Sequence, residues 1–164
     1  MLDPAMQPGA PDPVGNPQSA IRNPQSSSPH DPRRQARVLA MQALCCAEAL
    51  GENPDAEINL FFSEADADLD TRVRARTLFD RARERRASLD GLLKQLVREW
   101  DVARMAPVDR NVIRVAEAEL ALAEAPPRVV INEAIEIARE YGSAESPAFV
   151  NGVLDALLKH RPSG

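Results

Sequence analysis

The chain has 164 residues, a formal net charge of −5, 44% hydrophobic residues and 27% charged residues, values typical of one globular domain. Two histidines and two adjacent cysteines leave almost nothing from which to build a His/Cys metal site, a disulfide framework or a nucleophile–histidine pair. No stretch approaches the ~18 apolar residues of a membrane span, and no signal-peptide pattern stands at the start. The composition argues against most enzyme classes and predicts a cytoplasmic protein without metal or cofactor.

Residues 1–32 differ in composition from the rest of the chain. They hold eight of the fourteen prolines and show almost no apolar periodicity. Such a segment buries too little apolar surface to offset the entropy lost on ordering, so we expect a disordered tail. The tail is either a ligand for partner domains or an extension without function, and the lack of a PxxP motif among basic residues favours the extension. The folded unit is expected over residues 33–161.

Helical periodicity begins at Arg33 and continues through the folded unit. Apolar residues recur every three or four positions, with proline near several expected helix starts and glycine at two expected ends. The first expected helix covers residues 33–50, and a short second helix is opened by Asn53-Pro54. Two helices are expected within 71–99, with a joint near 86–88. The last three are a segment from Pro107 to Pro126, a helix lined by Val130 and Tyr141 that ends at Gly142, and a helix that begins at Ser146. The prediction is an all-α fold of six to seven helices.

Arginine dominates the basic residues, with eighteen Arg against two Lys. Guanidinium groups bind phosphates and stack on bases, which favours RNA, although a GC-rich genome gives the same bias without any function. Arg33, Arg34 and Arg37 lie at the start of the first expected helix and are expected to form one basic wall. Three positive charges there oppose the helix macrodipole, and this local conflict points to function. A larger arginine cluster over residues 72–86 alternates with acids and is interpreted as a solvated, paired face.

The acidic motifs do not predict a site. The aspartates within residues 66–70 imitate the first ligands of a calcium loop, but Thr71 and Thr77 occupy the positions that need glycine and glutamate. Glu133 and Glu136 lie one helical turn apart, without a histidine or a second carboxylate pair to complete a metal or acid–base site. We therefore expect no catalytic constellation.

Two segments near the end of the chain carry a specific resemblance. INEAIEIA occupies residues 131–138, and FVNGVLD follows at residues 149–155. Upstream motifs fall in the same order: RRQAR at 33–37, LDGL at 89–92 and VDRNVIR at 108–114. Together they resemble the family of the bacterial transcription antitermination factor NusB over about residues 33–158.

The resemblance implies a fold and a function. Members of that family are all-helical bundles of two subdomains, and they are not enzymes. They pair with NusE, a small-subunit ribosomal protein, and the pair binds the box A element of ribosomal RNA leader transcripts. This binding helps RNA polymerase read through termination signals. The resemblance thus implies a non-enzymatic RNA-binding adaptor.

The resemblance also implies site residues. Six residues match the family's RNA-contacting regions: Arg33, Arg34 and Arg37 in its arginine-rich opening, and Glu145, Ser146 and Phe149 in a second region. Asp109 and Arg110 match positions near the NusE surface. Phe149 is equally compatible with a core position and Ser146 with a helix cap. Cys45 stands where the family often has an aromatic residue on the face that meets NusE, which puts the affinity for NusE in question.

Two alternative functions remain open at this stage. The first is a stand-alone NusB-like RNA-binding domain associated with rRNA methylation, because a similar domain precedes the catalytic half of some rRNA cytosine methyltransferases. This sequence has no Gly-rich cofactor loop and no active cysteine motif. The second alternative is a helical protein-interaction module without RNA binding, which only a lack of RNA affinity would support.

Overall fold

The computed structural model describes residues 31–97 and 102–161, which form six α-helices and one short 3₁₀ helix. The helices are α1 (Pro32–Leu50), α2 (Asp55–Glu64), α3 (Leu69–Leu96), η2 (Val102–Arg104), α4 (Pro107–Leu122), α5 (Pro127–Tyr141) and α6 (Ser146–His160). No strand occurs within these two ranges, so the all-α prediction is confirmed. None of the helices described there is long and apolar enough to cross a membrane. Most of the predicted tail, residues 1–30, lies outside the described residues.

The ends of α1 follow from local chemistry. The Asp31 side chain accepts a hydrogen bond from the backbone N–H of Arg33 at 3.0 Å, and Pro32 occupies the first helical position, where no N–H is needed. Gly51 ends the helix with φ 77°, a left-handed conformation that favours glycine. The helix therefore starts one residue before the predicted position and ends where the sequence predicts.

Two predicted details of the next helices are wrong. The joint expected near residues 86–88 does not exist, because α3 is one continuous helix of 28 residues. That segment contains no glycine or proline, and Leu89 and Leu93 continue the buried face past it. The second helix begins at Asp55 rather than Pro54, because Asn53 adopts a left-handed φ of 58° and does not cap the helix.

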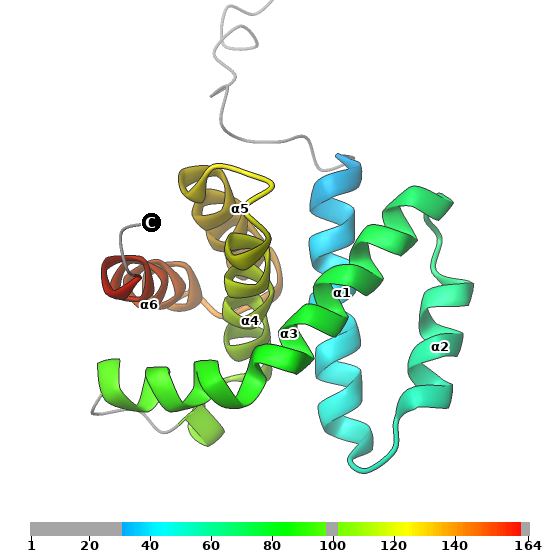
Figure 1. Ribbon diagram of the computed structural model, residues 1–164, viewed down its shortest axis with the longest axis horizontal. Coiled ribbons are helices and arrows are strands. Elements are labelled where there is room, and N and C mark those ends of the chain that lie inside the picture. The colour runs from blue at the N-terminus through cyan, green and yellow to red at the C-terminus, as the bar shows by residue number, and fades with distance from the viewer. Residues whose placement is uncertain (1–30, 98–101, 162–164) are drawn as a thin grey trace, which may run out of the picture.

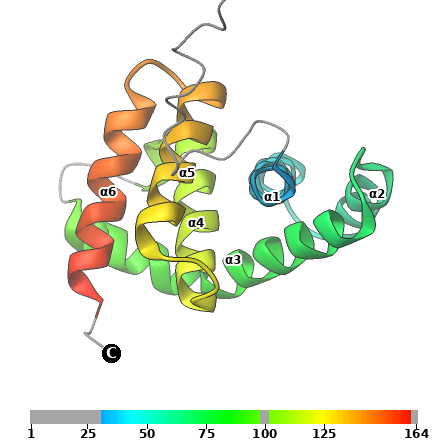
Figure 2. The ribbon, with the colours of Figure 1, turned by 90° about the horizontal axis from the view of Figure 1, so that it is seen from above.

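Helix α4 lies at the centre of the fold. It packs against α1, α3, α5 and α6, and every residue from 111 to 120 is buried. Figure 1 and Figure 2 show two groups of helices, with α1 and α2 on one side and α4, α5 and α6 on the other. Helix α3 runs along both groups, as Figure 2 shows from above. This arrangement agrees with the expected two-subdomain bundle.

Candidate nucleic-acid interface

The three arginines at the start of α1 do not form one exposed wall. Arg33 is exposed, and its guanidinium makes no ion pair within the described part of the chain. Arg34 and Arg37 are only 9% and 3% exposed. The predicted wall is therefore wrong in its geometry, because positions 34 and 37 face the neighbouring helices instead of solvent.

Arg34 ties α1 to α5. Its Nε lies 2.8 Å from Oε2 of Glu133 and its Nη2 lies 3.2 Å from Oε1, so the pair is bidentate. Glu133 is 1% exposed. The hydrogen bond to Glu133 raises the pKa of Arg34 above its ordinary value, and nearby Glu136 and Glu140 on α5 add to the effect. The guanidinium is thus committed to an internal partner.

Arg37 ties α1 to α4. Its Nε and Nη2 each lie 2.7 Å from a carboxylate oxygen of Glu119, which is completely buried, and its Nη1 lies 3.6 Å from Glu133. Arg74 of α3 reaches the same Glu119 at 3.4 Å. Burial lowers the pKa of Arg37, but the hydrogen bonds and charge of Glu119 outweigh burial and raise it. Two buried carboxylates thus bind three guanidiniums from two helices.

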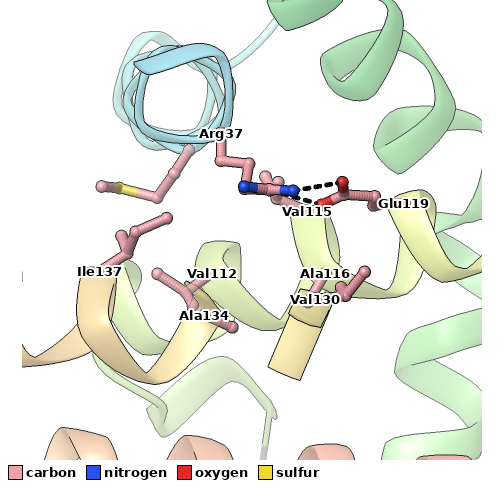
Figure 3. A pocket seen from close by; sticks show the side chains of 9 residues that line it. Arg37, Val112, Val115, Ala116, Glu119, Val130, Ala134 and Ile137 are labelled. Carbon is pink, nitrogen blue, oxygen red and sulfur yellow. Dashed lines mark hydrogen bonds and ion pairs between the residues drawn. The ribbon is translucent and has the colours of Figure 1, made fainter. Parts of the chain in front are cut away.

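Figure 3 shows Arg37 extending from α1 to Glu119 on α4, beside a small apolar pocket. The pocket has a volume of about 10 Å³, room for about one water molecule and too little for a ligand. Its apolar lining comes from α1, α4 and α5, and includes Met41, Val115 and Ile137. This region is therefore a packed junction of three helices and not a binding cavity.

Sequence reasoning missed Glu119 and Glu133 as partners of these arginines. One signal was present, since each glutamate interrupts an apolar helix face: Glu133 lies between Val130 and Ile137, which are both buried. A carboxylate in such a face predicts a buried cation. The partner itself was not predictable, because Arg34 is 99 positions away from Glu133.

The second predicted RNA region lies at the start of α6. Glu145 is exposed and immediately precedes the helix, whereas Ser146 is 1% exposed. The Ser146 Oγ accepts the backbone N–H of Ser143 at 2.9 Å, so it holds the preceding turn and does not cap α6. Phe149 is half-buried and packs against the core. Glu145 and part of Phe149 are therefore the accessible groups of this region.

Helix α5 connects the two predicted RNA regions. It carries Glu133, the partner of Arg34, and it packs against α6. Both views show α5 between α1 and α6 (Figure 1, Figure 2). The structure thus links the start of α1 to α6 through one helix.

The predicted NusE-facing pair is only partly accessible. The Arg110 Nη2 and Nε bind the carboxylate of Glu48 at 2.6 and 3.0 Å, and its Nη1 donates to the carbonyl oxygens of Val102 and Met105. Its guanidinium is therefore occupied internally. Asp109 is 8% exposed, and its Oδ1 has no hydrogen-bond partner among the described residues. Of the two, Asp109 alone has a side-chain polar atom without a hydrogen-bond partner among the described residues, and that atom is buried.

Cys45 lies on the same side of the molecule as the start of α4. The side-chain amide of Asn111 donates to the Cys45 Sγ at 3.3 Å, and the Sγ lies 3.6 Å from the carbonyl oxygen of Pro107. Burial raises the pKa of the Cys45 thiol, which favours the protonated form. The predicted partner-facing positions on α1 and α4 are therefore neighbours, and Cys45 contributes a small, uncharged side chain.

The arginine cluster of α3 is largely paired with acids. Arg76 binds Asp80 at 3.0 Å and Arg83 binds Asp55 at 3.1 Å, both with partly exposed side chains. These contacts support the interpretation of a solvated, salt-bridged face. Across the described ranges, no group of three His, Cys, Asp or Glu residues is placed to hold a metal ion.

Comparisons with known proteins identify the family. The NusB family profile matches residues 34–159. The antitermination protein NusB of Syntrophus aciditrophicus is 37% identical over 126 residues, which cover 76% of this chain and 78% of that protein. NusB of Desulforapulum autotrophicum is 41% identical over 128 residues, covering 76% and 90%.

Solved structures agree with the sequence match. NusB of T. maritima has a TM-score of 0.70 at 32% identity, covering 83% of this chain and 94% of that chain. A structure of the antitermination factors NusB and NusE in complex with double-stranded RNA has a TM-score of 0.71 at 27% identity, covering 80% and 99%. On the profile, the relatives and the fold together, this chain belongs to the NusB family.

Proposed function

We propose that this protein is a transcription antitermination factor, a non-enzymatic adaptor that binds box A-like single-stranded RNA together with NusE and promotes read-through by RNA polymerase. The observation that carries the proposal is the family match over residues 34–159, which spans almost the whole described helical bundle. The relative solved with NusE and RNA supports both partners. Because bacterial transcripts are made in the cytoplasm, we place the protein there.

We propose two kinds of RNA-site residue. Arg33, Glu145 and Phe149 are accessible and are proposed to contact RNA directly. Arg33 then binds backbone phosphate, while Phe149 offers part of its ring to a base. The three buried members of the predicted site are proposed to position these contacts: Arg34, Arg37 and Ser146.

The proposed NusE surface combines α1 and the start of α4. Asp109 lies two residues after Pro107, whose carbonyl oxygen is 3.6 Å from the Cys45 Sγ, which supports one surface made of both helices. Arg110 is proposed to act indirectly, because it holds Glu48 and the segment before α4 in place.

A transcription assay tests the proposal. The template carries a box A sequence upstream of a terminator, and read-through is measured with RNA polymerase and NusE in the presence and absence of this protein. We expect added protein to increase read-through only when box A is intact. Equal read-through on a scrambled box A would reject the proposed function, and a lack of any RNA affinity would favour the protein-interaction module.

A further inference from the structure

Two arginines converge on one buried carboxylate at the far end of α6. Glu117 of α4 is 6% exposed. Arg85 of α3 binds it through Nη2 at 2.6 Å and Nε at 2.9 Å, and the Arg161 Nη2, just after α6, lies 3.3 Å from the same carboxylate. One carboxylate balances only one guanidinium, so the cluster keeps an excess positive charge.

A cavity of about 460 Å³ opens beside this cluster, within the range of roughly 300–1,000 Å³ that is usual for ligand sites. Its polar lining consists of Arg85, Glu117, His160 and Arg161, and its aliphatic lining of Leu92, Ala121 and Leu157. The side chains of Arg85 and Arg161 are 41% and 32% exposed, so a ligand in the cavity reaches both. Their remaining N–H groups have no acceptor among the described residues.

The lining suits one nucleotide of a single strand. Guanidinium forks bind phosphate oxygens, and the excess positive charge attracts them. The Nδ1–H of His160 donates to the carbonyl oxygen of Ala156 at 3.1 Å, which restrains the ring against the last turn of α6. An imidazole or guanidinium plane stacks on a base, and the aliphatic lining of the cavity contacts the apolar part of that base.

We propose that Arg85, His160 and Arg161 form a second RNA contact, which holds a nucleotide of the transcript beyond the segment bound at the start of α1 and α6. This inference rests on the proposed function. Helix α6 has 15 residues, so at 1.5 Å per residue this contact lies about 21 Å along the helix from Ser146.

Fluorescence anisotropy with two RNAs tests the second contact on the full chain with NusE. One RNA contains box A alone, and the other is extended by about ten nucleotides at either end. We expect the extended RNA to bind more tightly. Arg161→Gln is expected to lower affinity for the extended RNA by up to about fivefold and to flatten its log–log salt slope by about 0.7, with the short RNA unaffected.

Glu117→Gln is the diagnostic variant. If Glu117 competes with RNA for the two arginines, the variant binds the extended RNA more tightly, whereas damage to the fold lowers its affinity. Removing the carboxylate frees both guanidiniums, so we expect tighter binding of the extended RNA alone. Structural damage would instead weaken both RNAs. Lys159→Gln is the matched control, since it removes one positive charge from the last turn of α6 but does not line the cavity.

The outcomes separate the two proposals. Specific binding of the short RNA with no gain on extension, or with Arg161→Gln equal to wild type on the extended RNA, would overturn the second contact and leave the proposed function intact. A larger loss in Lys159→Gln than in Arg161→Gln would also overturn it. Failure of the short RNA to bind better than a scrambled RNA would reject the proposed function and the second contact with it.

Discussion

Glu119 has no exposed surface, yet its side chain accepts hydrogen bonds from arginines on two helices. Arg37 binds both of its carboxylate oxygens at 2.7 Å, and Arg74 approaches one of them at 3.4 Å. A buried charge is costly unless it is paired and hydrogen-bonded, so neither arginine is replaceable without affecting the other.

Glu119→Gln is expected to lower the free energy of unfolding by about 3 kcal/mol or more, because it leaves Arg37 buried without its bidentate partner. Urea unfolding followed by circular dichroism measures the loss. Glu124→Gln is the control, since Glu124 also binds Arg74 but its side chain is 51% exposed, and a change below about 0.5 kcal/mol is expected. Equal losses in the two variants would show that the buried pair does not stabilise the fold.

The fold lowers the pKa of Glu48. Burial raises this pKa, but the hydrogen bonds and charges of Arg110 and Arg114 outweigh burial. Since the unfolded value is about 4.3, the stabilisation is complete above it and is lost as pH falls through the lower folded pKa. Glu48→Gln is therefore expected to be less stable than wild type at neutral pH, with the gap closing below about pH 4. Urea unfolding across pH checks this, and a gap independent of pH would contradict it.

For the three arginines at the start of α1, the sequence predicted their place in the helix but not their burial. The position of Arg33, Arg34 and Arg37 at a helix start was readable from local pattern. Their different roles were not, because burial of Arg34 and Arg37 depends on Glu133 and Glu119, which are 99 and 82 positions away. Pairing over such separations depends on how the helices pack, so the partner of each arginine cannot be predicted from local sequence.

At the scale of elements, apolar period together with proline and glycine predicted most of the helix bounds. Pro107 begins α4 and Gly142 follows the end of α5 as expected. Besides the start of α2, the exception is α3, whose exposed stretch at residues 86–88 interrupts the apolar pattern without breaking the helix. Packing explains this, because Leu89 and Leu93 lie on the same buried face as Leu78 and Ala82, so the helix is held on both sides of the stretch.

A pair of glycine variants tests this description of the helices. Gly91 lies inside α3 and an added Cβ would meet nothing within 4 Å, so Gly91→Ala is expected to raise the free energy of unfolding by about 0.5–1 kcal/mol. Gly142→Ala is expected to lower it by about 1–3 kcal/mol, because its Cβ would clash with Ser146 and lie 2.7 Å from the Ala138 carbonyl oxygen. Thermal unfolding compares them. A loss in Gly91→Ala would contradict a helical backbone at position 91 of α3.

At the scale of the whole molecule, ion pairs fasten α1 to the rest of the bundle at both ends. Near the start of α1, Arg34 binds α5 and Arg37 binds α4. Near the end of α1, Glu48 binds Arg110 and Arg114 of α4. Arg33 is left at the surface on a helix that is held on three sides. Most of the arginines thus form ion pairs within the fold. A net charge of −5 is consistent with RNA contact, because a few exposed cations suffice for it.

The most direct test of this account is the anisotropy of a labelled box A RNA titrated with wild-type protein and with Arg33→Gln, each with and without NusE. We predict that NusE tightens wild-type binding, and that Arg33→Gln weakens binding and flattens the log–log salt slope by about 0.7 without changing the free energy of unfolding. Unchanged affinity in Arg33→Gln, or equal affinity for a scrambled RNA, would contradict RNA recognition at the start of α1.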